Sequence, residues 1–202
     1  MMSDDEMFKL YVRAWRAVET AGAFVHYDGC MEPAGYFHPH EGAEGFSHPT
    51  IAIRRPYYAG NGRTPTHKRN AGAPPQLPPP DIGYELITLA HEYGHLMSWK
   101  GRTPRPAWDA YNAVAIKRSE AEIGIADLAS ADSARIALRN ALTDDERALI
   151  LAEEELAWRI GRELLQQVGF HTWDAYEARE REGMHFHRYR LGIEDAWPSD
   201  AD

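Results

Sequence analysis

Two histidines and a glutamate occur in the segment His91-Glu92-Tyr93-Gly94-His95, which has the pattern H-E-x-x-H. Residues four positions apart lie on one face of an α-helix, so His91 and His95 could direct ring nitrogens at one metal ion. Glu92 is turned by about 100° from His91, so its carboxylate could reach a water molecule bound to that metal. Zinc lowers the pKa of bound water toward neutrality, and Glu92 could take the proton as the water attacks a carbonyl. The pattern predicts a hydrolytic zinc site, provided that the segment is helical.

The residues around the motif predict this helix. Asp81 follows a run of prolines and can cap a helix that continues to about Trp99, where Gly101 and Pro104 end the pattern. Its apolar residues recur at steps of three and four, namely Ile82, Leu86, Leu89, Tyr93 and Leu96. The two histidines lie off this stripe, so we expect them to be available to a ligand.

A site with two histidines needs a third protein ligand and an open position for water. Metzincins have a glycine three residues and a histidine six residues after the second histidine. Here those positions are Ser98 and Gly101, so the sequence excludes the metzincin class. The third ligand must therefore come from another segment.

A second long helix is predicted from about Asp144 to Val168, and it carries three consecutive glutamates. Thr143 and Gly169 are its expected caps. Glu153 and Glu154 fall about 50° to either side of the centre of its apolar arc, whereas Glu155 projects to the polar face. A carboxylate in a core-facing stripe requires a cation, and zinc is such a cation. Glu154 also heads a column with the small residues Ala157 and Gly161, which would allow close approach to the histidine helix.

Several alternatives remain at this stage. The third ligand could instead be Glu153, Asp109, Glu120 or Glu122. Peptide hydrolysis also needs a donor near the developing oxyanion, for which the candidates are His171, Tyr176, His185 and His187. A patch of His38, His40, Glu41 and His48 could hold a metal but is expected to be loop, and Trp158 and Trp173 are expected in the core.

The segment Thr88-Leu89-Ala90-His91-Glu92-Tyr93-Gly94-His95-Leu96 resembles the T-x-A-H-E-x-G-H-L signature of ImmA/IrrE-like metallopeptidases, which are compact bacterial and phage gluzincins. Their second helix carries a ligand glutamate in a pattern like E-x-x-A-N-x-x-A-x-x-L-L. That pattern is similar to the series Glu154, Ala157, Trp158, Gly161, Leu164 and Leu165, with tryptophan where asparagine is usual. The resemblance covers about a third of the chain. It implies Zn²⁺ held by His91, His95 and Glu154 with Glu92 as general base. The separation between His95 and Glu154 is longer than the family leads us to expect, which indicates an inserted helix around Ala107–Ala129.

Composition limits the class of protein. The chain has 202 residues with 44% hydrophobic residues, enough for one globular domain with a real core. Its net charge of −9 provides no overall basic field to hold nucleic acid, so no nucleic-acid partner is expected. We expect a cytoplasmic protein without a membrane partner. The chain has a single cysteine, Cys30, no apolar run long enough to span a membrane, and an acidic N-terminal segment.

The sequence as a whole predicts an α+β, zincin-like fold over 1–194, predominantly helical with a small mixed sheet, followed by a polar tail over 195–202. The N-terminal helix is expected from Asp4 to Ala21, and further helices at Trp173–Glu182 and Met184–Ile193. Strands are expected at Phe24–Tyr27 and Thr50–Arg54, the second as an edge strand because prolines flank it, and 55–80 should be an irregular loop.

The predicted function is that of a zinc metallopeptidase acting on a specific intracellular protein or peptide, whose backbone would pair with the Thr50–Arg54 strand. The alternative is a metal-binding regulatory module without general peptidase turnover. A zinc hydrolase of a non-peptide amide is a third option.

Overall fold

A computed structural model describes residues 2–28, 35–38, 49–54, 81–101, 106–123 and 131–194. This part of the chain contains six helices and three short strands, which confirms a predominantly helical α+β protein. The predicted loop at 55–80, the tail at 195–202 and Cys30 lie outside the described residues. None of the described helices is both long and apolar enough to cross a membrane.

The described chain divides into two compact units. The first comprises Met1–Lys100 with Ala157–Trp173, and the second comprises Gly101–Leu156 with Asp174–Asp202. The boundary between Leu156 and Ala157 falls inside one continuous helix, α5 (Asp144–Val168), so this helix contributes its second half to the first unit.

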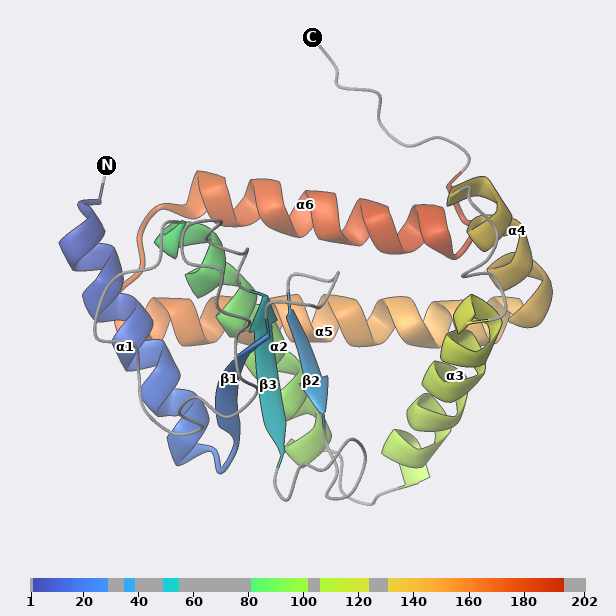
Figure 1. Cartoon of the computed structure of the whole chain (residues 1–202), viewed down its shortest axis with the longest axis horizontal. Helices are drawn as coiled ribbons and strands as arrows, with labels where there is room; N and C mark the ends of the chain where they lie inside the picture. Colours follow the sequence, from blue (N-terminus) through green and yellow to red (C-terminus); the bar gives the residue numbers. More distant parts are fainter. Residues whose placement is uncertain are drawn as a thin grey trace, which may run out of the picture. The chain divides into compact units, whose positions relative to one another are not determined.

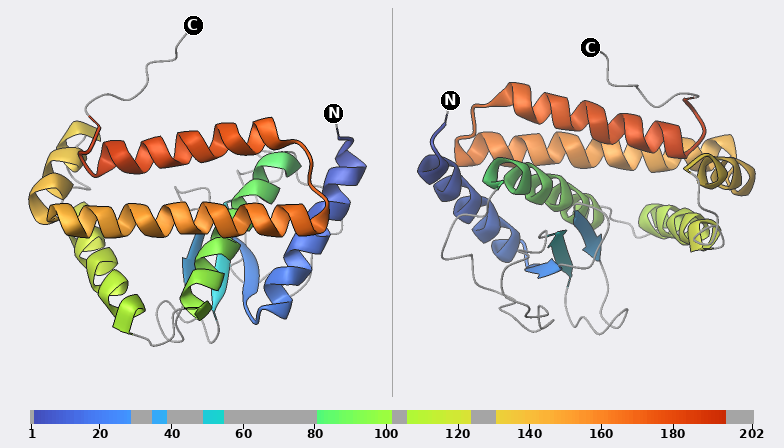
Figure 2. Two further views of the ribbon diagram at one scale, coloured as in Figure 1. Left: turned by 180° about the vertical axis from the view of Figure 1, so that it is seen from behind. Right: turned by 45° about the horizontal axis from the view of Figure 1, so that its top comes forward.

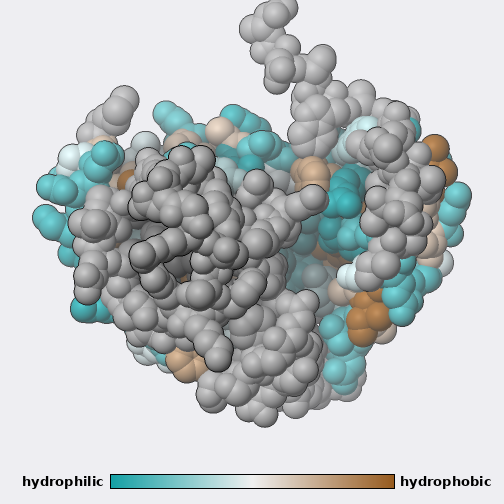
Figure 3. All heavy atoms as spheres, viewed as in Figure 1, coloured by the Kyte–Doolittle hydropathy of each residue, from teal (hydrophilic) through white to brown (hydrophobic). Residues whose placement is uncertain are grey.

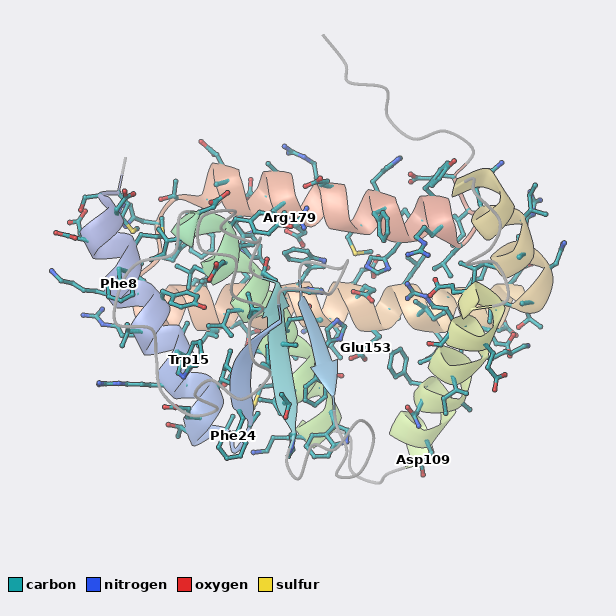
Figure 4. The ribbon with its side chains drawn as sticks, viewed as in Figure 1. Phe8, Trp15, Phe24, Asp109, Glu153 and Arg179 are labelled. Carbon is teal, nitrogen blue, oxygen red and sulfur yellow. The ribbon has the colours of Figure 1, made fainter. Side chains whose placement is uncertain are left out.

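The first unit begins with α1 (Asp4–Thr20), whose start agrees with the sequence prediction. Ser3 and Glu6 form a reciprocal cap, since the Glu6 backbone N–H donates to Ser3 Oγ and the Ser3 N–H donates to the Glu6 carboxylate. Gly22 follows the helix with a φ of 83°, a conformation that favours glycine. Figure 4 shows Trp15 on this helix, and its side chain is fully buried.

A three-stranded mixed sheet follows α1, in the order β1 (Phe24–Asp28), β3 (Thr50–Arg54), β2 (Gly35–His38) (Figure 1). β1 pairs with β3 in parallel and β2 pairs with β3 antiparallel, so the predicted mixed sheet is confirmed. The prediction that Thr50–Arg54 is an edge strand is wrong, because it is the central strand.

The physical reason lies in burial and in the position of the proline. Ile51, Ala52 and Ile53 are all fully buried, so both faces of β3 are covered. Pro49 precedes the first paired residue, and its carbonyl accepts a hydrogen bond from the Phe24 N–H at 2.9 Å. The proline therefore removes no hydrogen bond from the ladder.

The helix α2 (Ile82–Gly101) carries the H-E-x-x-H motif and begins as predicted, with the Tyr84 N–H donating to Asp81 Oδ1 at 3.1 Å. Seen from behind, α2 lies against the strands and is crossed on its other side by the second half of α5 (Figure 2). Covered on both sides, α2 buries every residue from Leu86 to Ala90.

The second unit contains α3 (Pro106–Ile123), α4 (Ala131–Ala141), the first half of α5 and most of α6 (Trp173–Arg190). A helix was expected at the position of α3, although 124–130 lie outside the described residues; α4 was not predicted. One helix runs from Trp173 through Gly183 to Arg190, so it continues past the expected end at Glu182 and stops before Ile193. The core of this unit consists of Val114, Leu138, Leu142, Ile150 and Leu191.

The predicted caps of α5 are confirmed. The Glu146 N–H donates to Thr143 Oγ1 at 3.2 Å, the Thr143 N–H donates to the Glu146 carboxylate at 2.7 Å, and Gly169 has a φ of 96°. The coloured surface in Figure 3 is mainly hydrophilic with separate hydrophobic patches, in keeping with the few large apolar side chains exposed in the described chain, such as Ile116 and Ile136.

Candidate metal centre

The two histidines of the motif are placed by α2 alone. Their Nε2 atoms are 3.2 Å apart, and the rings meet edge to face with centroids separated by 4.7 Å. Two nitrogens bound to one tetrahedral zinc at about 2.0–2.1 Å would be about 3.3–3.4 Å apart. The pair already has the separation that such an ion requires, so these residues fit a zinc ion without a change of backbone.

Close contact between α2 and α5 brings a second helix to this pair within the first unit. A Cβ added to Gly161 would lie 2.6 Å from the carbonyl oxygen of Ala90, and one added to Gly94 would overlap the carbonyl oxygen of Ala157. Both helices therefore present glycine where the other backbone lies. This contact agrees with the small-residue column expected from the sequence.

The glutamates of α5 lie one turn before this contact. Glu154 precedes Ala157 by three residues in the same helix. His91, His95 and Glu154 each offer one ligand atom, and these atoms lie within 4.8 Å of one another. The group could hold a metal ion, and two imidazoles with one carboxylate suit zinc.

The predicted pattern of burial along the three glutamates is confirmed. Glu153 is fully buried and Glu154 is 5% exposed, whereas the Glu155 side chain is 61% exposed. Burial alone did not distinguish Glu153 from Glu154, but among the described residues only Glu154 joins the histidines in a three-ligand group.

The structure does not bring the other carboxylate candidates into that group. Asp109 and Glu120 are exposed, and Figure 4 shows Asp109 on the first turns of α3. Glu122 accepts a hydrogen bond from Arg118 at 3.1 Å and lies 3.3 Å from Arg190.

Glu92 is only 5% exposed and lies under the start of β2. A Cβ added to Gly35 would be 2.9 Å from Glu92 Cγ, 3.0 Å from its Oε1 and 2.8 Å from Thr88 Cγ2. Any side chain at position 35 would therefore displace the carboxylate expected to act as base. Sequence reasoning missed Gly35, because no local signal relates it to a helix more than forty residues away.

Trp158 stacks on the ring of His91, with centroids 4.2 Å apart and planes inclined by 33°. It is 5% exposed, which confirms that it belongs to the core. Trp173 is half-buried and packs on Phe170 and Arg162. The chain therefore has an aromatic side chain, Trp158, in contact with the His91 ring, at the position where the ImmA/IrrE-like pattern has asparagine.

The four candidates for an oxyanion donor occupy different environments. His171 is exposed, Tyr176 is fully buried, and His185 is paired with Glu194. His187 Nε2 lies 3.4 Å from Glu154 Oε2 within the second unit. Which of them would serve a substrate stays open. The histidine patch of 38–48 lies outside the residues whose side chains are described.

The pKa values of two further ionisable side chains, Arg118 and Tyr93, are shifted. Burial opposes the charge of the Arg118 guanidinium, but the negative charges of Glu122 and Glu154 outweigh it and raise the pKa of Arg118. Burial raises the pKa of the Tyr93 hydroxyl, so that side chain stays neutral.

The search for related proteins gives no match: no family model, no curated protein and no solved structure corresponds to this chain. The resemblance to ImmA/IrrE-like metallopeptidases remains a prediction based on its motifs.

Proposed function

We propose that this chain is a zinc-dependent metallopeptidase with a zincin-like fold, similar to the ImmA/IrrE-like gluzincins. The observation that carries the proposal is the convergence of His91, His95 and Glu154, with the buried Glu92 next in sequence to the first histidine. Two histidines, one carboxylate and a neighbouring glutamate are the residue types that peptide hydrolysis by a gluzincin requires.

In this proposal His91, His95 and Glu154 would hold the ion, which would polarise the scissile carbonyl as a Lewis acid and lower the pKa of water. Glu92 accepts the proton of the attacking water and donates it to the amine of the leaving chain when the C–N bond breaks. Its burial beneath Gly35 keeps its carboxylate in a restricted position, which favours proton transfer along one direction.

The strand that would pair with a substrate is β2 rather than β3. In the described sheet β3 has neighbours on both sides, whereas β2 pairs with β3 alone. Gly35 at the start of β2 lies against Glu92, and Phe37 packs on Trp99 of the same helix, with centroids 5.9 Å apart. An extended peptide added to β2 would therefore pass close to the proposed base.

A second candidate is a metal-binding module without turnover. The observation that favours it is the proximity of His187 to Glu154, because a fourth protein ligand would close the coordination shell to water.

Metal content is the first measurement. Elemental mass spectrometry of the purified chain should find about one zinc per chain, with a sharp loss in Glu154→Ala. Glu155→Ala is the matched control, because the neighbouring carboxylate is exposed and should not affect zinc. Zinc retained in Glu154→Ala would refute the assignment of the third ligand.

The Glu92→Gln variant distinguishes a metallopeptidase from a metal-binding module without turnover. It should keep zinc but stop metal-dependent loss of a co-expressed protein, followed by quantitative proteomics against the wild-type chain. Cleavage by the variant at the wild-type rate would exclude Glu92 as the base, and no zinc-dependent loss with either chain would favour the module.

A further inference from the structure

His187 on α6 contacts the proposed carboxylate ligand, Glu154. Its Nε2 lies 3.4 Å from Glu154 Oε2, at ion-pair distance. Both side chains are largely withdrawn from water, with 17% of His187 and 6% of Glu154 exposed. The contact lies wholly within the second unit.

Glu154 has a second basic neighbour in that unit. The charges of Glu154 and Glu122 both act on Arg118, whose Nε donates to Glu122 at 3.1 Å. A buried carboxylate is costly unless basic groups compensate it. His187 and Arg118 supply such groups from α6 and α3, on elements separate from the helix that carries the histidine pair.

His187 does not belong to the group whose ligand atoms lie within 4.8 Å of one another. A carboxylate has two oxygens, so one can contact a histidine while the other binds a metal ion. The ligands of metal sites commonly depend on such outer partners for their orientation.

We propose that His187 is a positioning residue, which orients the Glu154 carboxylate for metal binding without itself being a ligand. The inference rests on the proposed metal site and deepens it. Helix α6 would act on the Glu154 carboxylate through this contact.

Zinc affinity tests the inference without a substrate. Competition with a chromophoric chelator should show binding by His187→Ala about 10–100-fold weaker than wild type. His187→Gln should recover part of the loss, because its amide can donate to the same oxygen. His185→Ala is the matched control, since His185 lies on the same helix and pairs with Glu194 instead.

The outcomes are distinguishable. Wild-type chain without zinc would overturn both the proposed function and this inference. Wild-type zinc affinity in His187→Ala would overturn the inference alone. Recovery in His187→Gln, with circular dichroism showing an unchanged fold, is the result that a purely structural role would not produce.

Cobalt substitution tests whether His187 is instead a ligand. In the positioning role, the visible absorption of the Co²⁺-loaded His187→Gln variant should keep the wild-type band pattern, at lower affinity. A change of bands that indicates the loss of one nitrogen ligand would overturn the inference and favour a closed site.

Discussion

Replacing Gly161 with alanine should weaken metal binding by moving α5 away from α2. The added Cβ would lie 2.6 Å from the carbonyl oxygen of Ala90 and 3.2 Å from the backbone nitrogen of His91. Both atoms belong to backbone inside a helix, so no side-chain rotation can relieve the overlap. The helices must separate at the turn that begins the H-E-x-x-H motif.

The size of the effect follows from these distances. Ordinary carbon–oxygen contacts start near 3.4 Å, so the helices must open by about 0.8 Å. Metal–ligand distances tolerate only about 0.2 Å, so the approach of Glu154 to the histidine pair should be lost. We expect zinc affinity to fall at least about tenfold, and overpacking to lower the free energy of unfolding by about 1–3 kcal/mol.

Gly83→Ala is the control for this experiment. Gly83 lies in the first turn of α2, and its added Cβ would find only Met7 Cε at 4.0 Å. The control should keep wild-type zinc affinity and gain up to about 1 kcal/mol of stability from helix propensity. Chelator competition and denaturant unfolding measure both quantities. Wild-type zinc affinity in Gly161→Ala would refute the reasoning that this contact sets the ligand distances.

Two further predictions concern other parts of the chain. Gly35→Ala should lower turnover on the order of 10²-fold while zinc content stays constant, because the new methyl group displaces Glu92; an unchanged kcat would contradict this steric role. Glu146→Gln should lower the Tm at pH 7, since hydrogen bonds from Lys117 and then Thr143 lower the pKa of Glu146 below 4.5. A carboxylate whose pKa is lower in the folded than in the unfolded state stabilises the fold above its unfolded-state pKa, and this stabilisation is lost as the pH falls through the folded-state pKa. The difference in Tm between wild type and Glu146→Gln should therefore shrink as the pH falls below about 4.5. A difference in Tm that stays constant with pH would contradict this prediction.

The sequence alone determined the local features of this protein. Helix starts could be predicted at Asp4, after Asp81 and after Thr143, because a cap acts on backbone groups within the next turn. The pairing of His91 with His95 likewise follows from helix geometry, which places residues four apart on one face. The burial of the α5 glutamates was predictable for the same reason, since one apolar arc fixes which side of a helix faces the core.

The strand order and the contacts between distant segments became known only from the tertiary structure. β3 is central because strands from both sides pair with it, and flanking prolines carry no information about those partners. His91, His95 and Glu154 lie on helices distant in the chain, yet their ligand atoms are within 4.8 Å of one another. Gly35 and His187 come near Glu92 and Glu154 only through long-range packing, and no periodicity or spacing encodes such contacts.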